Sequence, residues 1–251
     1  MFWRKQRQAL ERLHPLHRQL VEEHRFSATL PATDWSALVA SLARHEQSIK
    51  RHKWRLPAQA HAVVVPMLRI LQEDMEPGAP LGVTADLRGP RVADKRGPSR
   101  RLPVQRPVRS ATETVFTDPW FVARAELRDG SVLDVAVVER LRVRNVVKTS
   151  RSGKTKHKSK SKTVRVVQAT RRLPKGMPVR RPEPPAPPWL AVRVQQKDNG
   201  RTVLRSSAKL RPGADADAPA QILTVTGELF RWTPAAPPAS AASAPAPRRT
   251  R

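Results

Sequence analysis

One continuous stretch, residues 131–170, decides how this chain can fold: SVLDVAVVER LRVRNVVKTS RSGKTKHKSK SKTVRVVQAT. Apolar and polar side chains alternate through its first half and again near its end. A period of two is typical of a strand with one buried face, because successive side chains point to opposite faces. Gly153 can supply the positive φ that tight turns require. The stretch therefore predicts a long antiparallel β-hairpin that turns at Ser152 and Gly153.

Basic residues follow the same period of two within this hairpin. Lysine occupies every second position from Lys154 to Lys162, and no Asp or Glu stands between Glu139 and Pro178. In an extended chain such a row of ammonium groups attracts a polyanion. The residues that we expect to contact it are Arg140, Arg142, Arg144, Lys148, Arg151, Lys154, Lys156, Lys158, Lys160, Lys162 and Arg165.

The hydrophobic pattern predicts a register for the hairpin. Odd-numbered residues such as Leu141 and Val143 are apolar in the first strand, whereas the even-numbered Val164 and Val166 are apolar in the second. Directly paired residues share a face, so a two-residue turn would place Leu141 opposite Val164. Beyond Val143 the core-facing side of the second strand then becomes lysine, which cannot be buried unpaired. We therefore expect the basic hairpin, residues 140–165, to leave the domain beyond Val143 and Lys162. Its free part would have about eight residues per strand and a length of roughly 25 Å, at about 3.3 Å per residue.

The composition limits the classes of function. The chain has 251 residues and a net charge of +27, which favours DNA, RNA or an anionic membrane surface as partner. It has no cysteine, so disulfides, thiolate metal sites and a cysteine nucleophile are excluded. Tyrosine is absent and aromatic residues make up 4% of the chain. Since stacking platforms for single strands are built from aromatic residues, we expect contacts to the nucleic-acid backbone instead.

The first part of the chain, residues 1–76, has helical patterns. Leucines recur from Leu10 to Leu20 at helical spacing, and Pro15 is expected to kink or divide that helix. A second apolar stripe runs from Trp35 to Ile49. A third helical segment covers residues 58–75 with Pro66 inside it, and is expected to be either a kinked helix or a helix that starts at Pro66. These stripes predict a small helical module that mostly serves as core.

The rest of the chain is predicted to be a flexible linker, a β-domain and a tail. Residues 77–110 are rich in Gly, Pro and Arg and have little to bury. Residues 111–233 contain six expected strands, at 120–127, 131–147, 163–170, 189–195, 202–209 and 222–232. They predict an antiparallel sandwich or a partly open barrel. Residues 234–251 are rich in Ala, Pro and Ser and are expected to be disordered. The predicted fold class is α+β.

Other motifs point to no reaction. Gly153-Lys154-Thr155 resembles the end of a P-loop, but the glycine that the motif needs five residues earlier is Lys148. Glu11, His14 and His17 have a metal-like spacing, but Pro15 disturbs their helix and no second ligand cluster accompanies them. The segment 181–187 fits an Arg-x-x-Pro-x-x-Pro pattern, for which a stiff loop is favoured over a polyproline ligand. We expect no catalytic residue, metal or cofactor.

The leading hypothesis is a non-enzymatic protein that binds DNA or RNA through phosphates, largely without regard to sequence. The alternative is a structural or interaction protein whose helical module binds a protein partner while the basic arm contacts an acidic protein or lipid surface. The N-terminus lacks the apolar core of a signal peptide, and no stretch approaches the ~18 apolar residues of a transmembrane helix. The expected location is cytoplasmic. The choice between DNA and RNA and the oligomeric state stay open.

Overall fold

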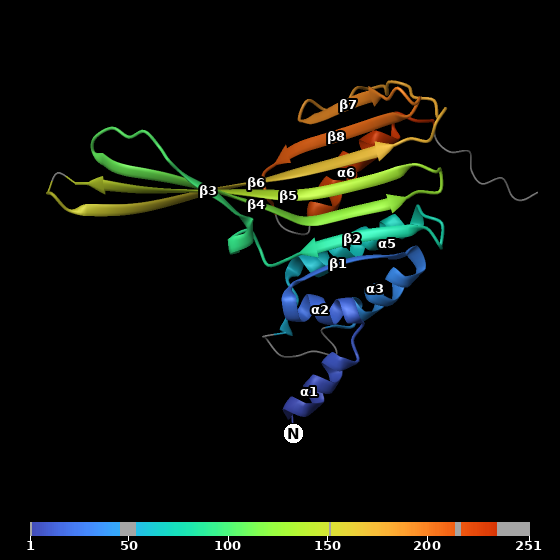
Figure 1. The fold of residues 1–251 in the computed structure, drawn as a ribbon, viewed down its shortest axis with the longest axis horizontal. Helices are drawn as coiled ribbons and strands as arrows, with labels where there is room; N and C mark the ends of the chain where they lie inside the picture. Colours follow the sequence, from blue (N-terminus) through green and yellow to red (C-terminus); the bar gives the residue numbers. More distant parts are fainter. Residues whose placement is uncertain (1, 46–53, 151, 214–216, 235–251) are drawn as a thin grey trace, which may run out of the picture.

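A computed structural model of the chain describes residues 2–45, 54–150, 152–213 and 217–234 (Figure 1). Its helical elements are α1 (Phe2–Glu11), α2 (Pro15–Glu23), η1 (Ala32–Asp34), α3 (Trp35–Ala43), η3 (Ala60–Val64), α5 (Val65–Glu73), η4 (Ala93–Lys95) and α6 (Ala218–Phe230). Its strands are β1 (Arg25–Pro31), β2 (Pro80–Asp86), β3 (Arg96–Arg101), β4 (Val108–Glu126), β5 (Val132–Thr149), β6 (Thr155–Arg172), β7 (Leu190–Gln196) and β8 (Thr202–Leu210).

The strands form one antiparallel sheet in the order β1-β2-β4-β5-β6-β8-β7, and β3 pairs with β4 beside this path. The predicted α+β class with an antiparallel β-domain is confirmed. The sheet is open: it is neither closed into a barrel nor stacked on a second sheet among the residues described. The strands predicted at 189–195 and 202–209 are present as β7 and β8, which pair as a hairpin.

Helices cover one face of the sheet and create a single core. α6 packs against β6 and β8, while α2, α3 and α5 lie beside β1 and β2 (Figure 1). Trp35 at the start of α3 is fully buried, and its indole N–H donates to the carbonyl of Leu81 in β2 at 3.0 Å. Phe26 of β1 and Phe121 of β4 belong to the same buried cluster. The helical segment and the sheet therefore share one core.

The predicted linker at residues 77–110 is wrong. β2 lies inside the sheet, between β1 and β4, and its side chains Leu81, Val83 and Ala85 are buried. The alternating pattern of this strand is short and is surrounded by Gly, Pro and Arg, which concealed it. β3 at residues 96–101 also pairs with β4, so much of the segment belongs to the sheet.

Two further elements differ from the sequence prediction. Residues 25–31 are a strand, so the first part of the chain is not purely helical. Residues 218–230 are the helix α6 where a strand was expected, and Ile222, Val225 and Leu229 are its buried positions. Their spacing of three and four is helical, and the β-branched residues in this segment misled the prediction.

The prolines of the helical segment act as the sequence indicates. Pro15 separates α1 from α2 and occupies the first turn of α2, where its missing N–H costs no hydrogen bond. The His14 side chain caps this helix by accepting from the Leu16 amide at 3.3 Å. Pro66 lies in the first turn of α5. The expected end of the second helix, residues 46–49, and the tail beyond residue 234 fall outside the described residues.

Candidate nucleic-acid interface

The long strands β4, β5 and β6 continue past the body of the molecule and form an arm, which we define as residues 96–116 and 140–163. It comprises β3, the segment 102–107 that connects β3 to β4, and the outer parts of the three long strands. The arm projects away from the α-helices (Figure 1). β5 is one of the two inner strands of the arm, paired with β4 up to Lys148 on one side and with β6 up to Thr149 on the other. The arm is thus wider than the two-stranded hairpin expected from the sequence.

The register of the arm differs by one residue from the prediction. Leu141 lies opposite Thr163, and Val164 lies opposite Arg140. The Ser150 amide donates to the Lys154 carbonyl at 2.9 Å, so three residues rather than two connect the strands. Gly153 has a φ of 75°, as expected for a three-residue hairpin loop with a left-handed glycine. Because the loop has one more residue than predicted, odd-numbered residues of β5 pair with odd-numbered residues of β6, and even-numbered residues with even-numbered ones.

This register brings the basic residues of both strands to one face of the arm. Arg142 pairs directly with Lys162, Arg144 with Lys160, and Lys148 with Lys156. We name this surface the cationic face; it consists of Arg140, Arg142, Arg144 and Lys148 of β5 and Lys156, Lys158, Lys160 and Lys162 of β6. The register predicted from the sequence put the lysines on the side opposite the arginines, whereas the observed register puts both on one side. The other face of the same strands carries neutral pairs such as Asn145 with Ser159.

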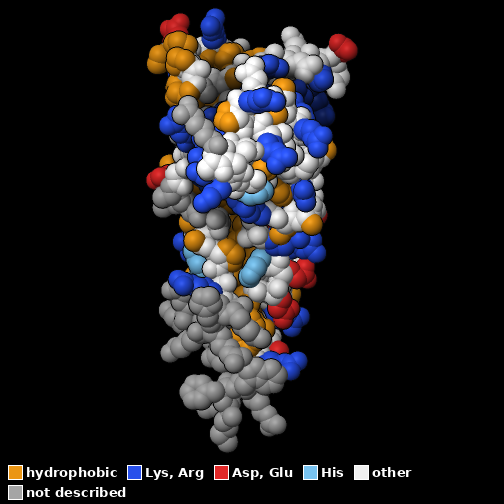
Figure 2. Space-filling view, turned by 90° about the vertical axis from the view of Figure 1, so that its left-hand side faces the viewer, with side chains coloured by type: hydrophobic (Ala, Val, Ile, Leu, Met, Phe, Trp, Pro, Cys, Tyr) orange, Lys and Arg blue, Asp and Glu red, His pale blue; other side chains and the backbone are white. Residues whose placement is uncertain are grey.

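Charge on the arm is almost entirely positive. The arm contains fifteen Lys or Arg residues and one acidic residue, Glu113. Glu113 lies 3.6 Å from Arg142 and 3.4 Å from Arg100, and both guanidinium groups stay largely exposed. Seen from the side on which the arm projects, Lys and Arg side chains gather on the upper part of the surface and acidic side chains lie near its margins (Figure 2). The arginines of β3 and β4 belong to this charge as well.

The residues predicted to contact a polyanion differ in their exposure to solvent. Lys154 and the cationic face are exposed, except for the half-buried Lys148. Arg151 lies outside the described residues. Arg165 is 2% exposed, and its Nε and Nη2 donate to Glu139 Oε1 at 3.1 and 2.8 Å. Its guanidinium also lies 5.9 Å from the centre of the Trp120 ring. Arg165 is therefore a core residue at the root of the arm, which corrects its assignment as a phosphate contact.

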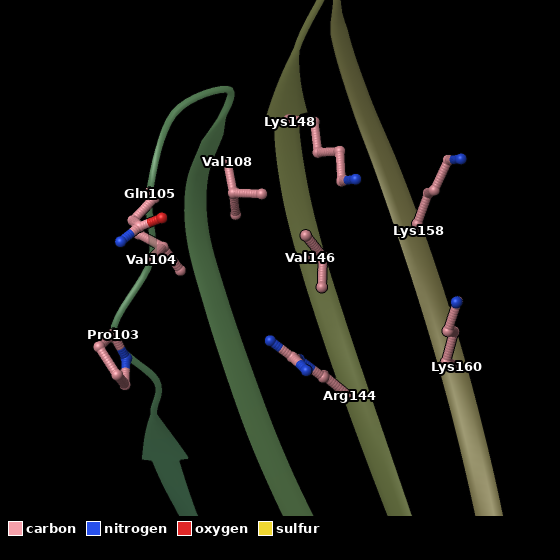
Figure 3. Close-up of a pocket in the computed structure, with 9 residues that line it drawn as sticks. All are labelled: Pro103, Val104, Gln105, Val108, Arg144, Val146, Lys148, Lys158 and Lys160. Atoms are coloured by element: carbon pink, nitrogen blue, oxygen red, sulfur yellow. The ribbon is translucent and has the colours of Figure 1, made fainter.

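A trough of about 720 Å³ runs along the cationic face. The segment 103–105 faces β5 and β6 across it, and Val108 and Val146 lie between (Figure 3). Arg144 points toward the 103–105 side. Its lining residues are Pro103, Val104, Gln105, Val108, Arg144, Val146, Lys148, Lys158 and Lys160. The trough thus combines an apolar floor with four cations.

A buried charged cluster holds the root of the arm. Lys95 Nζ lies 2.6 Å from Asp118 Oδ1 and 3.1 Å from Asp86 Oδ2. Burial raises the pKa of Asp118, although Lys95 opposes this. Burial also acts to raise the pKa of Asp86, but hydrogen bonds from Arg88 and Lys95 outweigh it and bring that pKa to about 2. No sequence motif announces this cluster, because its residues come from three separate segments.

Three histidines gather in the helical segment. His17 is fully buried, with Nε2 2.9 Å from His45 Nδ1 and Nδ1 2.8 Å from Ser41 Oγ. The His45 and His61 rings lie 6.4 Å apart. Burial, with a smaller effect of the neighbouring histidines, lowers the pKa of His17 to about 3. Even so, no three His, Asp or Glu residues in the described part of the chain are arranged to hold a metal ion.

Comparison with protein-family models, with curated proteins and with solved structures finds no match for this chain. The fold therefore defines the class by itself: an α+β protein with an open antiparallel sheet and a basic arm built from β3 and the outer parts of β4, β5 and β6. Among the residues that the structure describes, no helix is long and apolar enough to cross a membrane.

Proposed function

We propose that the cationic face of the arm binds nucleic acid through its phosphates and that the protein acts by binding rather than by catalysis. The observation that carries this proposal is the shared face of the two basic rows, which comes from the register of β5 and β6. Eight cations on one side of a projecting ribbon form an extended positive strip. Such a strip complements a phosphodiester backbone, because both carry charge at regular intervals.

The spacing of the strip supports backbone recognition. Successive cations are two residues, or roughly 6.6 Å, apart along β6 and from Arg140 to Arg144 on β5, and the two rows are separated by one strand spacing of about 4.8 Å. Lysine provides most of the contacts on β6, and an ammonium group acts as a point charge toward phosphate. Contacts of this kind position the nucleic acid and carry no direct sequence information. We therefore expect binding that depends little on sequence.

The test removes charge from the arm and compares it with equal charge removal elsewhere. The test variant changes Lys156, Lys158, Lys160 and Lys162 to Ser. The matched control changes Arg193, Lys197, Arg201 and Arg205, four exposed cations of the β7–β8 hairpin, to Ser. Affinity for labelled single-stranded and duplex oligonucleotides is measured by fluorescence anisotropy over a series of salt concentrations.

If about six phosphates are engaged, the log–log salt slope of the parent on duplex DNA should be about −5, at ~0.9 per phosphate. The arm variant should flatten this slope by two units or more, whereas the control should change it much less. Equal effects of the two variants would show that total charge, rather than the arm, determines binding. Binding by the arm variant as tight as that of the parent would refute the proposal.

A further inference from the structure

The trough on the cationic face has a lining that phosphate binding does not explain. Pro103, Val104, Val108 and Val146 present apolar surface next to Arg144, Lys148, Lys158 and Lys160. A duplex that meets the arm through its backbone would leave this apolar floor empty. The exposed Val104, beside the half-buried Val108 and Val146 in a highly charged region, points to a ligand that has an apolar part as well as negative charge.

An unpaired nucleotide has both parts. Its base offers an apolar face, and its phosphate offers charge to the lysines beside the floor. The trough volume of about 720 Å³ lies within the ~300–1,000 Å³ typical of ligand sites. The Arg144 guanidinium is planar and can lie against a base, as arginine does in many RNA complexes. No aromatic residue lines the trough, so little preference among the bases is expected.

We propose that the trough receives unpaired bases and that the arm therefore binds single-stranded nucleic acid more tightly than duplex. This inference rests on the proposed function of the cationic face. A duplex keeps its bases stacked and paired, and extracting one costs a few kcal/mol. A single strand presents its bases without that cost, while its phosphates follow the same strip of cations.

The experiment changes the trough and leaves the charge constant. Val146→Gln replaces the apolar floor with a longer polar side chain, and Val104→Gln does the same on the opposite wall. Val115→Gln is the matched control, because Val115 is a 37% exposed valine on the same face, opposite Arg142 but outside the trough lining. The probes are oligo-dT and oligo-rU of 20 nucleotides and DNA and RNA duplexes of 20 base pairs, at one salt concentration. Circular dichroism verifies the fold of each variant.

The parent should bind the single strands at least fivefold more tightly than the duplexes. Each trough variant should lower single-strand affinity about tenfold and leave duplex affinity within twofold, and the control should leave both unchanged. Comparison of the affinities for oligo-dT and oligo-rU shows whether the ribose 2′-hydroxyl contributes. Val104 is 38% exposed on a connecting segment, so its variant remains informative if Val146→Gln disturbs the strand.

The outcomes separate the two proposals. Unchanged single-strand affinity in folded trough variants, together with weakened binding by the four-lysine variant, would overturn the trough inference and leave the proposed function standing. Equal or tighter duplex binding by the parent would also overturn it. Both proposals fail if the parent binds no nucleic acid in a salt-dependent manner, or if the four-lysine variant binds as tightly as the parent.

Discussion

At the scale of residues, the core-facing side of β6 carries two arginines. Besides Arg165, the guanidinium of Arg171 is buried, donates to Ser131 Oγ and Thr233 Oγ1 at 3.0 and 2.9 Å, pairs with Asp129 and lies 4.1 Å from the Phe230 ring. A buried charge is tolerated when it is paired and hydrogen-bonded. Because arginine occupies these positions, the face of β6 that packs into the core has a polar pattern in the sequence. The apolar Val164 and Val166 therefore led to the prediction that the other face is buried.

The buried His17 predicts a pH dependence of stability. Its folded pKa of about 3 is below the ~6.5 of an unfolded histidine. Between these two pH values the unfolded state therefore binds more protons than the folded state. The stabilisation is therefore complete above pH 6.5 and is lost as the pH falls toward 3. Lowering the pH from 7.5 to 5 should reduce the free energy of unfolding by about 1–2 kcal/mol through this group.

Urea unfolding at several pH values checks this prediction, with His17→Gln as the comparison. The variant should lose less stability on acidification than the parent, because carboxylate effects are common to both chains. Parallel pH curves for the two proteins would show that His17 does not titrate in this way.

At the scale of elements, a single loop residue decides which face the lysines occupy. The side-chain period of a strand is two, so a shift of one residue moves every side chain of one strand to the opposite face. The three positions between Ser150 and Lys154 unite the lysine row with the arginine row. A two-residue turn would have separated the rows.

The absence of cysteine from the parent chain allows a direct test of this register. The pair Val143→Cys with Ser161→Cys should form an intramolecular disulfide under mild oxidation, because directly opposed Cα atoms are ~4.5–5.5 Å apart, within the range of disulfides. The pair Val143→Cys with Lys162→Cys should not, since these side chains lie on opposite faces. Mass spectrometry after thiol alkylation distinguishes the products, and the reverse result would support the two-residue turn.

At the scale of the whole molecule, the helical segment and the sheet share one core, from which the arm projects. β1 and β2 join the helical segment to the long strands, and one buried cluster extends from Leu10 to Leu229. Residues 77–110 thus contribute to the core and to the arm instead of separating two modules. The apolar stripes of α3 and α5 are used inside this core, which leaves them unavailable to a partner.

Hydrogen exchange should report this organisation. Amides of β2 should exchange as slowly as those of β5 within the body, because both strands are paired on two sides beneath the helices. Amides of the arm near residues 145–160 should exchange faster, since β6 has no outer partner there and no helix covers the strands. Rapid exchange throughout 80–86 would restore the linker interpretation.

The sequence by itself determined the features that depend on local patterns. Alternation predicted the long strands, Gly153 indicated the hairpin turn, and Pro15 and Pro66 indicated where helices are interrupted or begin. The charge of the arm was also evident, because it needs only a count and a period. The α+β class followed from these signals together.

Only the tertiary structure decided the features that depend on long-range pairing. The register of β5 and β6, the place of β2 in the sheet and the burial of Arg165 each require partners distant in sequence. The same is true of the trough, whose lining residues come from the 103–105 segment and three strands. A residue's neighbours across a sheet are set by loop lengths and by competition for one core, and one residue of difference reverses a face. The sequence therefore determined that the arm is basic, while the fold decided which surface its cations share.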